Sequence, residues 1–417
     1  MLTVLRTTWP LLLGVLLLLV GNGMQGTLLG IRGGIEGFST YQMSLVMSGY
    51  FVGFLFGSQI TPIMIRRVGH VRVFAALGSL ISAMLILYAA IPDWMAWALM
   101  RVVMGFSFSG VYITAESWLN ATSTNENRGR ALSAYMIAQM VGIISGQALI
   151  NVGDPAGYAL FIIPSVLVSL AFTPILLSAS PAPAFAAVKR LNFRKLYQVS
   201  PLGVVGMFLM GGVFSALFGM ASVWGTNAGL TVPQISVFVG AIYVGGLVAQ
   251  YPIGWASDRM DRRKIILAVY VVGALAMFVA FAFSPGFFML SILGGIAGAV
   301  ANPLYSLLIA YTNDYLDKDD MAAASGGLLF VNGIGAMISP PITGWLMETV
   351  GNGGFFLFLA LIFTAGAAYA LYRIACFPNR VGQFPGAYAV LSPSASALAV
   401  DEVLRAADGN ADANDKE

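Results

Sequence analysis

The segment Gly254-Trp-Ala-Ser-Asp258-Arg259-Met-Asp261-Arg262-Arg263-Lys264 joins two long apolar stretches. Six charged residues fall within the seven positions from Asp258 to Lys264, whereas the stretches on either side carry none. A charged loop between apolar stretches of about 20 residues is typical of a turn at a membrane surface. The loop therefore marks the facing ends of two predicted membrane spans, 234–256 and 265–284.

The composition of the whole chain agrees with a membrane protein. Of its 417 residues, 58% are hydrophobic and 9% are charged, against about 25% charged residues in soluble domains. The mean hydropathy is +0.83. A single cysteine, Cys376, and a single histidine, His70, exclude a disulfide framework and most metal or catalytic sites built from these residues. We therefore expect no enzyme activity, no cofactor and no metal, and no basic patch indicates nucleic acid.

Scanning for stretches long enough to cross a bilayer predicts twelve transmembrane helices in two sets of six. The first set covers 9–31, 41–65, 71–92, 94–118, 130–152 and 158–178, and the second covers 201–225, 234–256, 265–284, 287–312, 322–346 and 354–376. This predicts an N-terminal six-helix bundle (1–178), a cytoplasmic central loop (179–200) and a C-terminal bundle (201–376). The polar tail, 377–417, is expected to be cytoplasmic and disordered because it is too short to bury a core. The first span lacks a cleavage site and is not predicted to be a signal peptide.

The basic residues predict the orientation of the chain. Cytoplasmic loops near a membrane are enriched in lysine and arginine. If the N-terminus is cytoplasmic, 19 of the 21 lysines and arginines lie on the cytoplasmic side, and only Arg32 and Arg101 do not. Both termini are therefore predicted to be cytoplasmic.

The two sets of spans are also related as copies. An offset of 192 residues places Gly53 on Gly245 and Arg67 on Arg259, with the breaks between spans in step. Ser44, Leu55 and Ser133 match in the same way. The pattern predicts an all-α polytopic protein of two pseudo-symmetric six-helix bundles, an architecture in which transporters bind a solute near the midplane.

The charged loop resembles the signature loop of the Major Facilitator Superfamily, Gly-x-x-x-Asp-Arg-x-Gly-Arg-Arg. Gly254, Asp258, Arg259, Arg262 and Arg263 match it, and Asp261 replaces the second glycine. The resemblance implies the twelve-helix fold of that superfamily and a conformational latch, in which Asp258 pairs with nearby arginines when the inner side is closed. The alternative is a plain basic loop that stops translocation.

The equivalent loop of the first half departs from the signature. It keeps Arg67 and Gly69 but has Arg66 in place of the aspartate, so a latch there needs a carboxylate from elsewhere. Glu116 is the nearby candidate. Three further motifs, Arg101-x-x-x-Gly105, Gly142-x-x-x-Gly146 and Gly335-x-x-x-Ser339-Pro340-Pro341-x-x-Gly344, are similar to patterns of the superfamily, although small-residue spacing is common at membrane helix interfaces.

Two stretches resemble a bacterial branch of the superfamily, the YcaD-type permeases. They are Ala115-Glu-Ser-Trp-Leu119 with Asn127-Arg-Gly-Arg-Ala-Leu-Ser-Ala-Tyr-Met136, and Gln250-Tyr-Pro-Ile-Gly254. The resemblance implies a multi-pass protein of the bacterial cytoplasmic membrane and no particular substrate.

Charged residues inside a span are costly and are functional candidates. Arg101 either reaches outward as an anchor or faces a cavity, where it binds an anion or takes part in charge coupling. Glu116 either forms a helix-end ion pair with Arg66, Arg67 or Arg128, or carries a proton. No other acidic residue lies deep in a predicted span, so a proton is a possible coupling ion only through Glu116 and Arg101.

Uncharged polar side chains within the spans are candidates for lining a substrate cavity, or alternatively for tying helices together. They are Asn22, Gln25, Tyr112, Tyr135, Gln139, Tyr243, Asn302, Tyr305 and Asn332.

These features predict a monomeric secondary or facilitative transporter that moves a small solute through the bilayer by alternating access. The sequence lacks a phosphate-binding loop, so ATP is not its direct energy source. Import of a polar metabolite and export of an amphipathic compound both suit the candidate cavity residues. The alternative is a non-transporting sensor or receptor with a transporter-like fold.

Overall fold

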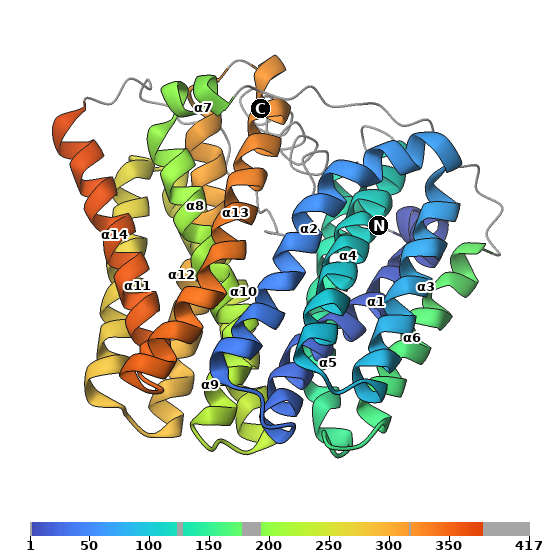
Figure 1. Ribbon diagram of the computed structural model, residues 1–417. Helices are drawn as coiled ribbons and strands as arrows, with labels where there is room; N and C mark the ends of the chain where they lie inside the picture. Colours follow the sequence, from blue (N-terminus) through green and yellow to red (C-terminus); the bar gives the residue numbers. More distant parts are fainter. Residues whose placement is uncertain (1, 123–127, 177–192, 317, 378–417) are drawn as a thin grey trace. The chain divides into compact units, whose positions relative to one another are not determined.

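The computed structural model describes residues 2–122, 128–176, 193–316 and 318–377, without the side chains of 2–7, 121–122, 128–130, 175–176, 318–319 and 322. Most of the predicted central loop and all of the predicted tail after Phe377 lie outside the described residues. The described elements are helices, connected by short turns (Figure 1).

The first half of the chain contains α1 (Leu2–Ile35), α2 (Thr40–Val68), α3 (His70–Ala90), α4 (Trp94–Thr122), α5 (Arg128–Leu149), η1 (Ile150–Val152) and α6 (Ala159–Leu176). The second half contains α7 (Phe193–Val199), α8 (Pro201–Ser215), η2 (Ala216–Met220), α9 (Ala221–Asn227), α10 (Val232–Ser257), α11 (Arg262–Phe283), α12 (Phe287–Asn313), α13 (Lys318–Val350) and α14 (Gly354–Cys376). Within the described residues, 11 helices are long and apolar enough to cross a membrane, and Ala159–Pro174 is a shorter apolar helix. The predicted all-α polytopic fold is confirmed, and the count of twelve spans holds approximately because the sixth is short.

The chain forms two compact units. Unit 1 comprises Met1–Ala187 and Phe218–Val239, and unit 2 comprises Val188–Leu217 and Gly240–Glu417. Residues 218–239, from the second half of the sequence, therefore belong to unit 1. The chain passes from one unit to the other inside η2, and again within α10. The limits predicted for the two bundles, 1–178 and 201–376, stay predictions.

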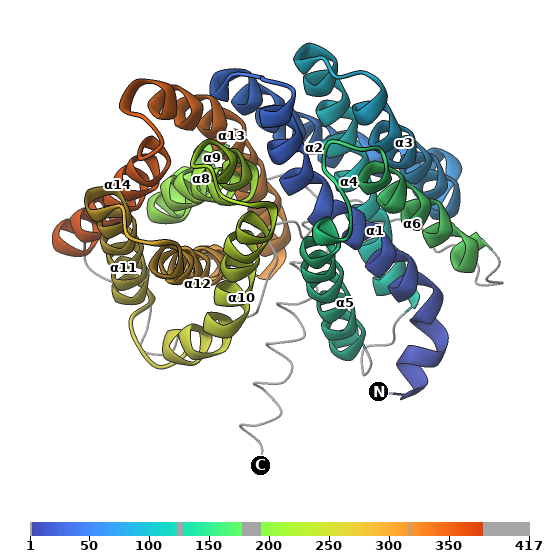
Figure 2. The same cartoon turned by 90° about the horizontal axis from the view of Figure 1, so that it is seen from below.

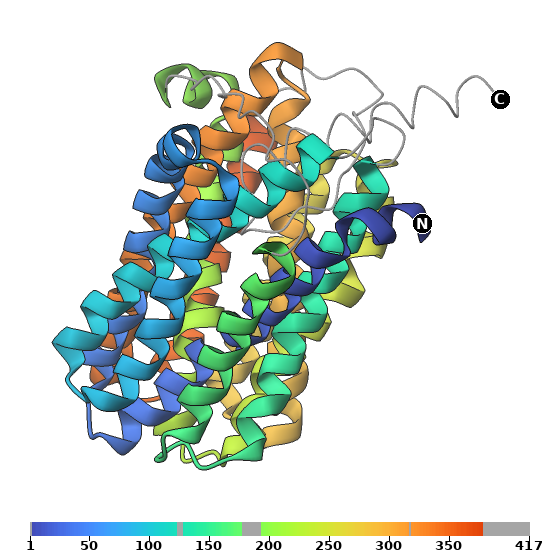
Figure 3. The ribbon, with the colours of Figure 1, turned by 90° about the vertical axis from the view of Figure 1, so that its right-hand side faces the viewer.

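Each unit is a set of closely packed helices. In unit 1, α1 packs against α5 and α6, while α4 packs against α2 and α3; Figure 3 turns these blue, teal and green helices toward the viewer. In unit 2, α8 packs against α12, α13 and α14, and α11 packs against α12 and α14. The pairs α1 with α5 and α11 with α14 lie side by side in Figure 2.

Glycines allow equivalent helix pairs in the two halves to approach closely. A Cβ atom added at Gly53 of α2 would collide with the backbone carbonyl of Val102 in α4, and one added at Gly245 of α10 would collide with that of Gly295 in α12. Gly53 and Gly245 are the positions matched by the 192-residue offset. The sequence repeat therefore corresponds to the same kind of helix crossing in each half.

Two features of the helices were not predicted. The seventh span, expected as one helix over 201–225, is interrupted by η2, a π-helix at Ala216–Met220. No proline marks this interruption in the sequence, and π-helical turns are frequent at functional sites. The second feature is α7, a short helix in the C-terminal part of the predicted central loop.

The turn between α2 and α3 depends on Gly69. This residue has φ of +85°, a backbone conformation that favours glycine, and it is both the C-cap of α2 and the N-cap of α3. The positive φ therefore explains why a glycine occupies this position of the first-half loop.

Candidate functional site

Arg101 lies in α4 and is buried, with 3% of its surface exposed. Its Nη1 donates to Oε1 of Gln25 at 2.7 Å, and its Nη2 donates to the Met47 sulfur at 3.2 Å. Its guanidinium carbon lies 4.9 Å from the ring centroid of Tyr50, a cation–π arrangement. Among the described side chains, no carboxylate forms an ion pair with it, and its Nε has no hydrogen-bond acceptor.

A chain of hydrogen bonds extends from Arg101 through α1 and back to α4. Gln25 Nε2 donates to Asn22 Oδ1 at 3.2 Å, and Asn22 Nδ2 donates to the Tyr112 hydroxyl at 2.9 Å. The Tyr50 hydroxyl also donates to Asn22 Oδ1, at 3.5 Å. Four residues singled out in the sequence, Arg101, Gln25, Asn22 and Tyr112, are therefore brought together in what we call the Arg101 network. Met47 and Tyr50 of α2 complete it.

Glu116 begins a second polar cluster on the same face of α4. It is 1% exposed, and its Oε1 accepts a hydrogen bond from the Tyr135 hydroxyl of α5 at 3.1 Å. Gln139, also buried, lies one helical turn beyond Tyr135. Arg101, Tyr112 and Glu116 follow one another at spacings that a helix of about 3.6 residues per turn places on one face, over about 22 Å of its axis. The face therefore has a cation near one end and a carboxylate near the other.

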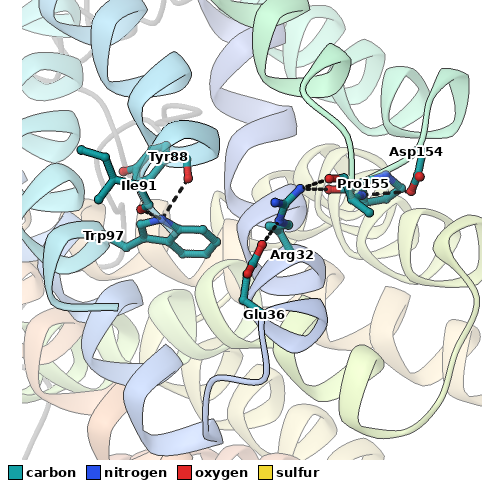
Figure 4. A network of polar contacts seen from close by, with 8 residues as sticks. Arg32, Glu36, Tyr88, Ile91, Trp97, Asp154 and Pro155 are labelled. Carbon is teal, nitrogen blue, oxygen red and sulfur yellow. Dashed lines mark hydrogen bonds and ion pairs between the residues drawn. The ribbon is translucent and has the colours of Figure 1, made fainter. Parts of the chain in front are cut away.

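Arg32 shows the contrasting case of an arginine at a helix end. Its Nε pairs with the Glu36 carboxylate at 2.5 Å, and its Nη1 donates to the carbonyl of Pro155 at 3.1 Å and to that of Ala156 (Figure 4). Nearby, the Trp97 indole N–H donates to two carbonyls where α3 ends, at Tyr88 and Ile91. Arg32 ties the end of α1 to the turn before α6, which is a structural role.

The cavity candidates from the second half of the sequence lie in different surroundings. Asn332 donates to the Met207 carbonyl at 3.2 Å and so ties α13 to α8. The Asn302 amide packs where a Cβ at Gly246 would lie, and Tyr305 is fully buried in the same helix. Tyr243 is partly exposed on α10. Of these, the Asn332 contact corresponds to the helix-tying alternative.

Arg262 is held by a partner that sequence reasoning missed. Its Nη1 lies 2.5 Å from Oδ1 of Asp314 and 3.2 Å from the carbonyl of Ala310, and its Nε donates to Ser257 Oγ at 3.0 Å. Both charged side chains are buried, with 2% and 6% exposed. Asp314 follows shortly after the predicted tenth span. Its place at a helix end, on the same side of the membrane as the basic loop, is the sequence feature that could have identified it as a partner.

The other charges of the loop are more exposed. Asp258, the aspartate of the signature, has 43% of its side chain exposed and lies 3.7 Å from Arg262 Nη2. Asp261, which replaces the second signature glycine, caps α11 by accepting from the Arg263 backbone N–H and pairs with the Arg263 side chain at 3.1 Å. Arg259 stacks over Trp255, with 4.4 Å between guanidinium carbon and ring centroid. Gly254 is buried in α10.

The first-half loop reaches the fourth helix through His70. Arg66 and Arg67 are exposed, whereas His70 is buried and its Nε2 lies 2.9 Å from Ser117 Oγ of α4. The 192-residue offset aligns His70 with Arg262, which contacts α12, the corresponding helix of the second half. The role of Arg67 and Glu116 as a latch stays a prediction.

Comparison with known families decides the class of the chain. The family model of the Major Facilitator Superfamily matches residues 11–242 and again residues 203–393. The chain belongs to the Major Facilitator Superfamily. Relatives of this superfamily member include the uncharacterised MFS-type transporter YcaD of Escherichia fergusonii, 29% identical over 369 residues that cover 86% of the chain and 93% of the relative. YcaD of Salmonella arizonae is 26% identical over 370 residues, covering 86% and 94%. The resemblance to the YcaD-type branch is confirmed.

Solved structures of the superfamily share its fold. The nucleoside transporter NupG, as a D323A mutant, has a TM-score of 0.76 at 13% identity, covering 88% of the chain and all of that structure. A bacterial homologue of the lysosomal transporter Spinster has a TM-score of 0.67 at 13% identity, covering 95% and 97%. The Escherichia coli fucose–proton symporter FucP has a TM-score of 0.56 at 16% identity, covering 89% and 99%. Family and relatives together indicate a multi-pass membrane transporter.

Proposed function

We propose that this protein carries a small organic solute across the bacterial cytoplasmic membrane by alternating access, acting as a monomer. The observation that carries the proposal is the Arg101 network, in which a buried cation, two amides and two tyrosine hydroxyls converge inside membrane-spanning helices. Such groups are costly in the bilayer and mark substrate pathways. Asn22 and Tyr50 are partly exposed, so the network reaches the surface of unit 1.

The packing of residues 218–239 supports the alternating-access part of the proposal. Ser222 Oγ donates to the Gly26 carbonyl at 3.4 Å, and Asn227 Nδ2 donates to Thr40 Oγ1 at 2.7 Å. A Cβ at Gly30 would collide with Ser222. These contacts lie near the end of unit 1 where α1 ends and α2 begins, which the positive-inside rule places outside the cytoplasm. We propose that they close this end and separate when it opens, with η2 as the bend.

Counterflow in proteoliposomes tests carriage directly. Vesicles with purified protein are loaded with an unlabelled solute and exposed to a trace of the same solute with a radiolabel, for a panel of anionic, neutral and cationic metabolites. A carrier gives transient accumulation of the label for at least one solute. Folded, correctly reconstituted protein that exchanges none of them would instead favour a transporter-like sensor.

Proton coupling is assigned in this proposal to Glu116. A buried carboxylate is costly to keep charged, so a conformational change that admits water from one side and then the other would exchange its proton. The Glu116→Gln variant is expected to lose uptake driven by an imposed pH gradient while it keeps counterflow. The matched control, Glu348→Gln, alters an exposed carboxylate at the end of α13 and should behave as wild type. Gradient-driven uptake that survives in Glu116→Gln would contradict the assignment.

The signature loop is proposed to act as the latch of the second half. In this role Asp258 supplies the exposed charge that can exchange partners, whereas the buried Arg262–Asp314 pair holds the loop to α12. The two aspartates thus have separate tasks, and substitutions of them should have different effects.

A further inference from the structure

The surroundings of Arg101 contain more hydrogen-bond donors than acceptors. A guanidinium has five N–H groups. In the structure, two hydrogen bonds use its Nη atoms, one to the Gln25 side-chain carbonyl and one to the Met47 sulfur, a weak acceptor. Its buried Nε has no acceptor among the described residues. Tyr88 of α3, an electrostatic neighbour of Arg101, is fully buried, and its hydroxyl has no partner there either. The site offers a cation and unused donors to an incoming group.

An anchoring role explains these contacts poorly. An arginine that anchors a helix extends its charge to the membrane surface, as Arg32 does toward the carbonyls of the turn before α6. Arg101 remains 3% exposed and faces α1 and α2. A buried charge without a counterion is unfavourable, and none of the described carboxylates pairs with Arg101, so the site suits a counterion supplied by a bound ligand.

Aromatic rings surround the approach to this cation. The rings of Tyr50, Phe54, Tyr112 and Phe108 form a closed cycle of contacts, with centroid separations of 6.2 to 6.4 Å between successive members. Tyr50 and Phe54 are partly exposed, whereas Tyr112 and Phe108 are buried. A ligand that reaches Arg101 past Asn22 and Tyr50 would therefore lay its body against aromatic surface.

We propose that Arg101 binds the carboxylate of an aromatic organic acid, whose ring packs against Tyr50, Phe54 and Tyr112. In the structure, the Gln25 carbonyl oxygen accepts from Arg101 where one carboxylate oxygen would bind, and the ligand displaces it to gain the Nε–H and the Tyr88 hydroxyl as donors. A single guanidinium, with only tyrosines as titratable neighbours, matches one negative charge and favours a carboxylate over a doubly charged phosphate. This inference rests on the proposed transport function, because it names the substrate class of the same site.

Matched acids and amides test the inference on the purified full-length protein. Benzoate, phenylacetate and cinnamate are compared with benzamide, phenylacetamide and cinnamamide by ligand-induced thermal stabilisation and calorimetry. At least one acid should bind, and more tightly than its amide. Arg101→Gln should weaken the acid by about tenfold or more, which corresponds to about 1.4 kcal/mol, and should weaken the uncharged amide much less, because hydrogen bonds to charged groups are the stronger ones. Arg72→Gln, at an exposed arginine of α3, is the control and should bind as wild type.

A second variant keeps the test valid if Arg101→Gln does not fold. Tyr88→Phe keeps the cation and removes only the hydroxyl donor, so it should weaken the acids several-fold and leave the amides unchanged. The inference would be overturned by equal binding of acids and amides, or by folded protein that binds no acid. It would also be overturned by a preference for acids that survives in Arg101→Gln or is unchanged in Tyr88→Phe. Counterflow of a neutral or cationic solute that is insensitive to Arg101→Gln would overturn it too, and the carrier function would stand. Acid binding without counterflow of any solute would support the site and contradict the carrier.

Discussion

Asp314→Ala is expected to destabilise the protein by about 3–5 kcal/mol, because it removes the buried carboxylate that lies closest to the buried Arg262 guanidinium. The pair has an N–O distance of 2.5 Å, and 2% and 6% of the two side chains are exposed. Removing one member of a buried ion pair costs far more than removing an exposed one. The midpoint of thermal unfolding, followed by tryptophan fluorescence in detergent, would fall accordingly.

Asp258→Ala is the matched control for this prediction. Asp258 lies 3.7 Å from the same guanidinium with 43% of its side chain exposed, so its loss should cost less than about 1 kcal/mol. The double variant Asp314→Ala, Arg262→Leu should recover part of the lost stability, since it also removes the charge left behind. Equal effects of Asp314→Ala and Asp258→Ala would contradict the assignment of Asp314 as the main partner.

Gly53→Ala is expected to destabilise the protein by about 3 kcal/mol through overpacking between α2 and α4. The added methyl group would collide with the Val102 carbonyl and lie 2.8 Å from the Phe106 backbone nitrogen, neither of which can turn aside as a flexible side chain can. The equivalent Gly245→Ala, against α12, should have a comparable effect. Thermal unfolding and the yield of monodisperse protein would measure both.

The same change at Gly240 should have the opposite sign. No atom lies within 4 Å of a Cβ added there, so Gly240→Ala removes only the flexibility of glycine inside a helix and should stabilise by about 0.5–1 kcal/mol. A Gly53→Ala variant as stable as wild type would show that α2 and α4 are not in contact at this crossing.

The sequence predicted the features that depend on local pattern. Spans follow from hydropathy, and the 192-residue repeat aligns Gly53 with Gly245, which make the same kind of close helix contact. Asn22, Gln25, Arg101 and Tyr112 were identifiable because polar groups are rare in membrane helices. Each is conspicuous without knowledge of its neighbours.

Features that depend on helix packing could not be predicted in the same way. Tyr50, Met47 and Tyr88 resemble ordinary residues of apolar helices, and only the packing of α2 and α3 brings them near Arg101. The sequence predicts Glu116 near a helix end, but its burial could not be predicted. It is 1% exposed because α5 covers it with Tyr135. The interruption at η2 has no proline to announce it. Which side chain pairs with which, as for Arg262 and Asp314, is decided by the fold.

Site-directed labelling tests most directly whether the Arg101 network is exposed to the two faces of the membrane in alternation. Phe51 is partly exposed beside Tyr50, with 5.5 Å between ring centroids, and Cys376→Ser removes the one native cysteine. Phe51→Cys in that background is treated with a membrane-impermeant maleimide in right-side-out and inside-out vesicles, with and without Gly30→Val, which should hinder packing of Ser222 on α1. We expect labelling from both faces, with Gly30→Val accelerating labelling from the non-cytoplasmic face and slowing it from the cytoplasmic face. Labelling from one face only, unchanged by Gly30→Val, would contradict alternating exposure.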